Sequence, residues 1–210
     1  FIKAQLVTGA RKVRIDTDSP LVIGVDPAIS DGDRSAIIRR KGRRAFHLET
    51  YMNYNTMELV GLVRQIIEKE NPACVCIDSI GIGAGIVDRL KEMGYQQVQG
   101  VNVARSANLK DKFANLRAEL WHDMREWLAQ ESPVEIPDSD ELMGDMTSLG
   151  YRFDSSGKLL IESKEQLKKR GMKSPDTADA LALTFFVGEY LHNNVYKPTR
   201  APSHARGMFT

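Results

Sequence analysis

The sequence predicts an α/β fold in which a mixed β-sheet carries helices on both faces. The first strand-like segment, Leu21–Val25, is apolar or glycine at every position, which is typical of a strand buried on both sides. Two further strand-like segments follow after short turns, and strands then alternate with amphipathic helical patterns. A meander followed by such alternation is the order expected of a layered α/β domain.

The first half of the chain is expected to build the sheet. Residues 1–20 are polar and irregular, and we interpret them as a linker. A hairpin turn at Lys41-Gly42 joins the second and third strands, Thr56 caps the next helix, and Asn71-Pro72 ends it. Glycines Gly81, Gly83 and Gly85 form a turn that leads into a helix ending near Gly94. The expected strands are Leu21–Val25, Ser35–Arg39, Arg44–Thr50, Ala73–Ile77 and Val98–Val103.

The second half is predicted to be mainly helical. Ser155-Ser156-Gly157 indicates a hairpin between Tyr151–Asp154 and Lys158–Glu162. The last helix begins with Ser174 as its cap and Pro175 in its first turn, and extends to about Leu191. Residues 21–191 would form one domain, and 192–210 a flexible tail. The other expected elements are a helix over Lys110–Gln130, a strand over Val134–Ile136, a helix capped by Ser139 that extends through Leu149, and a helix over Lys164–Arg170.

Composition excludes several classes of protein. The chain has 210 residues and a formal net charge of +1, which argues against a protein that coats polyanions generally. No apolar run approaches the ~20 residues that a membrane span needs. The two cysteines, Cys74 and Cys76, lie in one predicted strand and are poorly placed for a disulfide with each other. Because the sequence begins at Phe1 without an initiator Met, we expect it to be part of a longer protein.

Four aspartates are the candidate functional residues. Asp26 and Asp78 each end an apolar strand, and parallel neighbouring strands would bring both to one edge of the sheet, where α/β proteins bind ligands. Asp176 and Asp179 share one face of the last helix because three residues separate them. A buried carboxylate is costly unless a cation or hydrogen bonds satisfy it. An oxygen-rich cluster suits one or two Mg²⁺ or Mn²⁺ ions, the cofactors of phosphodiester hydrolysis.

Each aspartate also has an ordinary structural explanation. Asp26 can form a turn before Pro27, Asp78 can cap the following helix, and Asp176 can oppose the dipole at the helix N-terminus. The helical spacing leaves open whether Asp176 or Asp179 is the principal third metal ligand. The occurrence of all four in this order favours the metal site over four separate explanations.

Three blocks of sequence resemble the nuclease domain of phage large terminase subunits. Val22–Ala28, with Gly32-Asp33 and the downstream Arg39–Gly42, resembles its first acidic strand and hairpin. Cys76–Leu90 resembles its second acidic strand and glycine-rich turn, and Ile161–Leu181 its closing motif. The likeness extends over about residues 20–190, and the order of the three blocks makes it specific.

The resemblance implies a ribonuclease H-like fold and a metal-dependent endonuclease that cuts concatemeric double-stranded DNA with little sequence specificity. By motif position, Asp26, Asp78 and Asp179 would be catalytic metal ligands, with Asp176 beside them. It also implies a phage protein acting at the procapsid in the host cytoplasm, with the portal protein and small terminase subunit as partners. The ATPase motor of such proteins would precede Phe1, because this chain has no phosphate-binding loop of the Walker type.

Basic residues near these motifs are candidate DNA contacts, because phosphate contacts supply most nonspecific affinity for DNA. Lys164 is our choice for the closest approach to the scissile phosphate. The alternative to DNA contact is that these side chains are ordinary solvent-exposed residues of a turn and a helix. The other candidates are Lys168, Lys169, Arg170, Arg40 and Arg43.

Other functions remain as alternatives. A Holliday-junction resolvase or a transposase would share the fold and the acidic chemistry, and a preference for branched DNA would favour the former. A noncatalytic module that docks to DNA or to a portal would bind without cutting. An actin-like ATPase is disfavoured because its phosphate loops are missing. Trp121 and Trp127 are interpreted as packing residues of a helix rather than platforms for bases.

Overall fold

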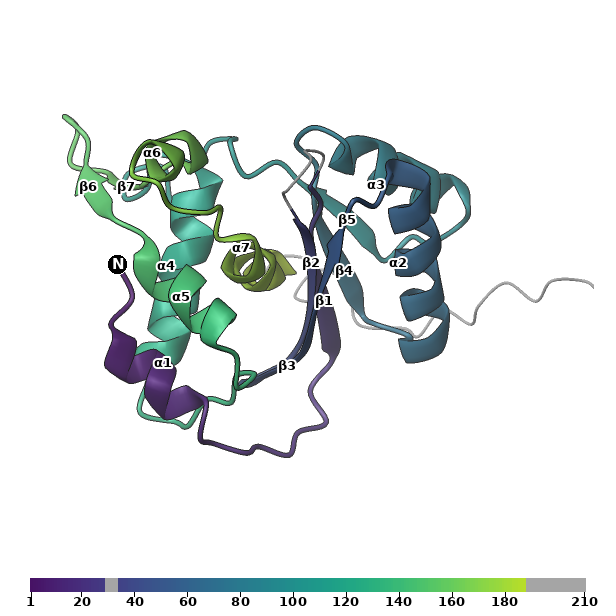
Figure 1. The fold of residues 1–210 in the computed structure, drawn as a ribbon, viewed down its shortest axis with the longest axis horizontal. Helices are drawn as coiled ribbons and strands as arrows, with labels where there is room; N and C mark the ends of the chain where they lie inside the picture. The colour runs from purple at the N-terminus through teal and green to yellow at the C-terminus, as the bar shows by residue number, and fades with distance from the viewer. Residues whose placement is uncertain (29–33, 188–210) are drawn as a thin grey trace, which may run out of the picture.

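A five-stranded mixed sheet forms the centre of the molecule (Figure 1). The structure is a computed structural model of the chain and describes residues 1–28 and 34–187. The strand order is β3-β2-β1-β4-β5, with β1 antiparallel to β2 and parallel to β4. The strands are β1 (Leu21–Asp26), β2 (Arg34–Lys41), β3 (Arg44–Met52), β4 (Cys74–Asp78) and β5 (Val98–Val101), and a separate hairpin pairs β6 (Tyr151–Phe153) with β7 (Leu159–Ile161).

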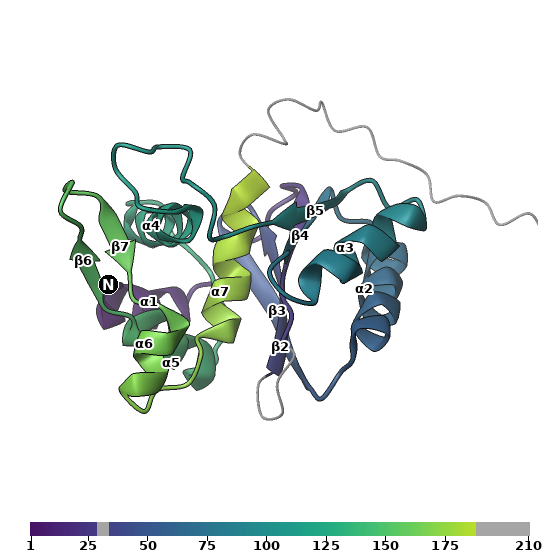
Figure 2. The same ribbon diagram turned by 90° about the horizontal axis from the view of Figure 1, so that it is seen from above.

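Helices cover both faces of this sheet. Two of them, α2 and α3, pack on one face, and α7 lies against the other with α1, α4 and α5 behind it (Figures 1 and 2). A short 3₁₀ turn, Thr184–Val187, follows α7. The α/β prediction with helices on both faces is therefore confirmed. The helices are α1 (Ala4–Ala10), α2 (Thr56–Glu70), α3 (Gly83–Glu92), α4 (Leu116–Ala129), α5 (Asp140–Ser148), α6 (Lys164–Lys169) and α7 (Asp176–Leu183).

The alternation of side chains along β1 divides the core into two layers. Ile23 and Val25 pack with the layer beneath α2 and α3, whereas Val22 packs with the layer beneath α7. Gly24 faces α7 as well, and a Cβ on it would lie 1.9 Å from the carbonyl oxygen of Ala180. Because only glycine fits there, the backbones of β1 and α7 lie in direct contact.

Several boundaries differ from the sequence prediction. The segment expected to be an irregular linker contains α1, whose Val7 and Ala10 are buried in the core. Asn55, not Thr56, caps α2, because its side chain completes a capping box with Glu58. The domain limits 21–191 remain a prediction, and both Leu191 and the expected tail over 192–210 lie outside the described residues.

The later helices also begin and end at other residues than predicted. The long helix begins at Leu116 instead of Lys110, because residues 110–115 turn and Phe113 bridges to Leu159. At α7 the predicted Ser174 cap is wrong, since Pro175 holds the cap position without a side-chain hydrogen bond. Residues 134–136 form only a bridge between Glu135 and Arg44 in place of a strand.

Candidate metal and phosphodiester site

The register of the sheet brings Asp26 and Asp78 together. Strands β1 and β4 are parallel neighbours in which Val25 pairs with Ile77, so the two aspartates follow at adjacent C-terminal ends. Both also lie on the α7 side, because Val22 and Gly24 in β1, like Cys74 and Cys76 in β4, face that layer. This is the arrangement expected from the sequence, in which parallel neighbouring strands place both carboxylates at one edge of the sheet.

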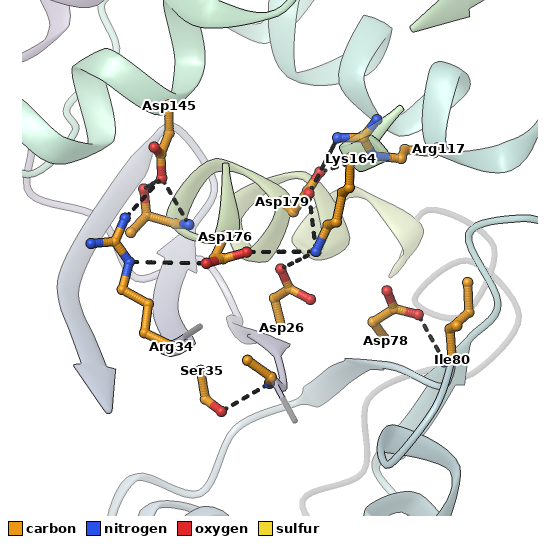
Figure 3. Close-up of polar contacts among 12 residues, drawn as sticks. Asp26, Arg34, Ser35, Asp78, Ile80, Arg117, Asp145, Lys164, Asp176 and Asp179 are labelled. Carbon is orange, nitrogen blue, oxygen red and sulfur yellow. Dashed lines mark hydrogen bonds and ion pairs between the residues drawn. The ribbon is translucent and has the colours of Figure 1, made fainter. Parts of the chain in front are cut away.

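Helix α7 supplies the other two carboxylates. Its first residue is Asp176, and Asp179 lies one turn further on, so both face the sheet edge where Asp26 ends β1 (Figure 3). Asp26, Asp176 and Asp179 are all buried, with exposed fractions of 3%, 6% and 8%. The structure thus brings into one site all four aspartates that the sequence singled out.

Lys164 lies at the centre of this acidic group. Its Nζ is 3.1 Å from Oδ2 of Asp26, 3.6 Å from Oδ1 of Asp176 and 3.6 Å from Oδ2 of Asp179 (Figure 3). Burial alone would lower the pKa of Lys164, but the carboxylates of Asp26, Asp179 and Asp176 together raise it. The ammonium group therefore stays charged and acts as the internal counter-ion of the site.

Asp26 is the most perturbed carboxyl of the group. Burial raises its pKa to about 8, and the neighbouring carboxylates of Asp179, Asp176 and Asp78 act in the same direction against the opposing effect of Lys164. Burial likewise raises the pKa of Asp78 and of Asp176. The ammonium group of Lys164 does not offset the effects of burial and of the neighbouring carboxylates on Asp26, so a further cation beside Asp26 would be stabilising.

Asp179 differs from its neighbours because donors hold it firmly. Arg117 donates from Nε to Oδ1 at 3.1 Å and from Nη2 to Oδ2 at 3.2 Å, and Trp121 donates its indole N–H to Oδ1 at 2.7 Å. Burial acts to raise the pKa of Asp179, but Arg117 and Lys164 lower it below its ordinary value. Asp179 is therefore a fixed, ionised carboxylate.

Sequence reasoning missed the part that α4 plays in this site. Trp121 is fully buried, as the packing interpretation expects, but its N–H also donates to the carboxylate of Asp179, one of the candidate site residues. Arg117 precedes Trp121 by one helical turn and also donates to the carbonyl oxygen of Glu162 at 2.7 Å. The sequence contains one indication of this role. Arg117 lies one helical turn from Trp121, on a helix face that is otherwise apolar.

Asp78 and Asp176 have fewer partners. Asp78 accepts one hydrogen bond, from the backbone N–H of Ile80 to Oδ1 at 3.0 Å, and it points away from Lys164 (Figure 3). Beyond Lys164, Asp176 lies 4.0 Å from Nε of Arg34. Arg34 in turn pairs with Glu141 and Asp145, and Asp145 accepts from the N–H and hydroxyl of Thr177.

The donor set fits a divalent cation. Four carboxyl groups, those of Asp26, Asp78, Asp176 and Asp179, gather at the site, and hard oxygen ligands are the type that Mg²⁺ and Mn²⁺ prefer. Within the described residues, however, no three such side chains converge closely enough to form a ready-made ligand set. The carboxylates would have to rotate toward one another to hold an ion.

The basic residues predicted to contact DNA fall into two groups. Arg40 and Arg43 lie at the opposite end of the sheet, since Lys41 and Arg40 pair with Leu21 and Val22 at the start of β1. Arg40 is half-buried and donates to the hydroxyl and carbonyl oxygens of Thr184, and burial lowers its pKa to about 10. These bonds give Arg40 a structural role at this end of the sheet, and its contact with DNA stays a prediction.

Arg43 has a similar role at that end. Its guanidinium donates to the side chain of Gln130 at 2.6 Å and to the carbonyl oxygens of Ser132 and Pro133, and so links the hairpin turn to the end of α4. By contrast, α6 lies beside the aspartates. There Lys168 and Lys169 are exposed, and Arg170 pairs with Glu162.

The fold matches several solved structures. No family model and no curated protein matches the sequence. The nuclease domain of the large terminase subunit gp2 of bacterial virus Sf6, as a mutant with manganese and beta-thujaplicinol, superposes with a TM-score of 0.78 at 17% identity, covering 87% of this chain and 96% of that chain. The large terminase nuclease of thermophilic phage G20c with bound magnesium gives a TM-score of 0.62 at 18% identity, covering 81% of this chain and 82% of that chain.

The protein therefore has a ribonuclease H-like fold. More specifically, its structure matches the nuclease domains of the large terminase subunits of Sf6 and G20c, so the resemblance inferred from three sequence blocks is confirmed in structure. No helix in the described portion of the chain is long and apolar enough to cross a membrane.

Proposed function

We propose that this chain is a divalent-metal-dependent endonuclease domain that hydrolyses double-stranded DNA during phage DNA packaging. The observation that carries the proposal is the convergence of Asp26, Asp176 and Asp179 on Lys164 beside Asp78, in a fold shared with terminase nucleases. Among the matching structures, one Sf6 nuclease domain contains manganese and one G20c nuclease contains magnesium, which supports the same cofactors here.

Asp26, Asp78 and Asp179 would hold one or two Mg²⁺ or Mn²⁺ ions, with Asp176 able to join them. When bound, such an ion activates water and offsets the charge that develops on the phosphate during in-line displacement. The fixed position of Asp179 would orient the ion, and the raised pKa of Asp26 means that binding releases a proton near neutral pH. Lys164 would contact the scissile phosphate when it binds among these aspartates.

The biological setting is part of the same proposal. An ATPase motor elsewhere in the protein would bring DNA to this domain, and a portal protein and small terminase subunit would be partners, in the host cytoplasm at the procapsid. We expect cleavage with little sequence specificity, because contacts to phosphates hold the DNA in place but carry no sequence information directly.

A plasmid assay tests the proposal directly. The purified protein is incubated with supercoiled plasmid and Mn²⁺, beside an EDTA control, an Asp26→Asn variant and an Asp88→Asn variant. Asp88 is exposed on α3 away from the site, so its variant controls for loss of a carboxylate in general. We expect metal-dependent nicking and linearisation by wild type and Asp88→Asn, and none by Asp26→Asn. DNA binding without cutting in Mn²⁺ or Mg²⁺ would support a docking module instead.

A further inference from the structure

A cavity of about 630 Å³ opens directly beside the aspartates. Its charged wall consists of Asp26, Asp78, Asp179, Lys164 and Arg117. The rest of the cavity extends from this wall between α4, the β6–β7 hairpin and α6 on one side and the C-terminal ends of the sheet strands on the other. The cavity is thus continuous with the proposed catalytic centre and several times larger than a metal ion and a phosphate group require.

The remaining walls are largely apolar. Leu120 and Leu183 form a buried floor, with exposed fractions of 3% and 2%. Val103 and Leu160 are half-buried along the sides, and Ile80 is 48% exposed at the mouth. Metal ions and phosphates bind through oxygen atoms and charges, so neither explains an apolar surface in this place.

Two exposed cations line the cavity, together with the exposed Glu165. Arg152 on β6 and Lys169 on α6 both line it, and both are exposed to solvent. Their positions allow contact with phosphates that flank whatever group enters. The cavity therefore combines a metal-binding wall, an apolar interior and a basic rim, which together match the parts of a nucleotide: phosphate, base and neighbouring phosphates.

We propose that this cavity binds one unstacked nucleobase of the strand being cleaved, next to the scissile phosphate. The inference rests on the proposed nuclease function and adds a substrate class to it. A nucleobase has flat apolar faces, and its sugar keeps it within a short distance of the phosphate at the aspartates. The volume lies in the range of about 300–1,000 Å³ that is usual for small-ligand sites with apolar walls.

A base that remains paired within a duplex cannot enter such a cavity. It must leave the stack, which costs a few kcal/mol in a regular duplex and least at a mismatched or unpaired position. The domain should therefore bind a duplex containing an unpaired nucleotide more tightly than a fully paired duplex. Cleavage should occur next to that nucleotide.

Three otherwise identical duplexes separate base binding from simple flexibility. The first is fully paired, the second contains one unpaired 2-aminopurine nucleotide, and the third has an abasic nucleotide in the same place. Binding is measured with Ca²⁺ in place of Mn²⁺, and cutting is measured separately with Mn²⁺. We expect about tenfold tighter binding of the second duplex than of either other duplex, with a change in 2-aminopurine fluorescence when the base enters the cavity.

A pair of leucine variants locates the effect. Leu160→Gln puts a polar group on the cavity wall, whereas Leu109→Gln alters an exposed leucine outside the cavity. The preference for the unpaired base should fall to near unity in Leu160→Gln and persist in Leu109→Gln. The wild-type comparison of the three duplexes needs no variant, so it decides the matter even if Leu160→Gln fails to fold.

The outcomes distinguish this proposal from the nuclease proposal. Equal binding of all three duplexes, or equal binding of the abasic and unpaired-base duplexes, overturns the base site and leaves metal-dependent cutting untouched. Base-dependent binding without cutting in Mn²⁺ supports the cavity and overturns the nuclease function.

Discussion

Arg117 on α4 holds both oxygens of Asp179 on α7, through two hydrogen bonds of 3.1 and 3.2 Å. This fork-shaped contact is the arrangement in which arginine and carboxylate interact most strongly. It joins two helices that are distant in the sequence and leaves Asp179 with one orientation. Asp26, Asp78 and Asp176 have no comparable support from an arginine fork among the described residues.

Replacement of Arg117 by lysine should weaken metal binding. Lysine keeps the charge but cannot donate to both oxygens in the plane of the carboxylate. We expect a roughly tenfold higher Kd for Mn²⁺ in calorimetric titration and a loss of about 1–3 kcal/mol of unfolding free energy. Arg125→Lys is the matched control on the same helix, because Arg125 pairs with the exposed Glu126 away from the site. Unchanged Mn²⁺ affinity in Arg117→Lys would show that Asp179 needs no such support.

Removal of the internal counter-ion should have the opposite effect on metal affinity. In Lys164→Met the carboxylates lose the one ammonium group placed among them, so a divalent cation entering the site no longer meets a like charge. We expect Mn²⁺ to bind at least about tenfold more tightly in titrations near pH 8. The metal-free variant should be less stable than wild type. Lys12→Met, which alters a lysine next to α1 far along the chain from the site, serves as the control.

Stability in the absence of metal should fall as the pH rises. Asp26 has a pKa near 8 in the folded protein against an ordinary value of 3.8. At pH values between these two, Asp26 therefore holds a proton in the folded state that it has lost in the unfolded state. Its contribution to stability is complete below about pH 4 and is lost as the pH rises through about 8. Asp26→Asn, which stays neutral, should remove this dependence and be more stable than wild type above about pH 9, by roughly 1–3 kcal/mol.

Denaturant unfolding with EDTA at several pH values measures this effect. A wild-type stability that rises from about pH 6 to about pH 9, in parallel with the variant, would contradict the raised pKa of Asp26. Addition of Mn²⁺ at the higher pH should restore the stability of wild type more than that of Asp26→Asn, since binding stabilises the folded state by mass action.

Two glycines in the first turn of α3, the helix that follows β4, should respond differently to alanine. A Cβ on Gly83 would lie 1.7 Å from the backbone oxygen of Asp78, whereas a Cβ on Gly85 meets nothing closer than 3.7 Å. Gly83→Ala must displace Asp78 and should cost about 3 kcal/mol or more, with loss of cutting. Gly85→Ala should be neutral or stabilising by up to about 1 kcal/mol, because Gly85 lies within helix α3. Thermal unfolding and the plasmid assay check both.

The strand periodicity allowed much of the fold to be predicted from sequence. The apolar run of β1 and the capping of α5 by Ser139 are local features, and the structure has both. The boundaries that differ depend on distant contacts: α1 is helical because its buried residues pack against the α7 side of the core, and residues 110–115 turn because Phe113 meets Leu159. Such contacts leave no local periodicity to detect.

The candidate site shows the same division. That the four aspartates converge could be predicted because strand ends and helical spacing are properties of the sequence near each residue; their role as metal ligands stays a prediction. Arg117 was missed because nothing close to it in sequence indicates that α4 passes behind α7. Arg40 and Arg43 were assigned to DNA because their charges cluster in sequence, but the register of β1 and β2 puts them at the far end of the sheet.

The close approach of Gly24 to Ala180 has a consequence for behaviour on heating. Side chains gain freedom before a protein unfolds, and distances that depend on their packing then become variable. The separation of β1 from α7 depends instead on two backbones in contact, with no side chain between them. The spacing of Asp26 from Asp179 should consequently hold up to the unfolding transition, so that metal affinity and the folded fraction are lost over the same interval of temperature.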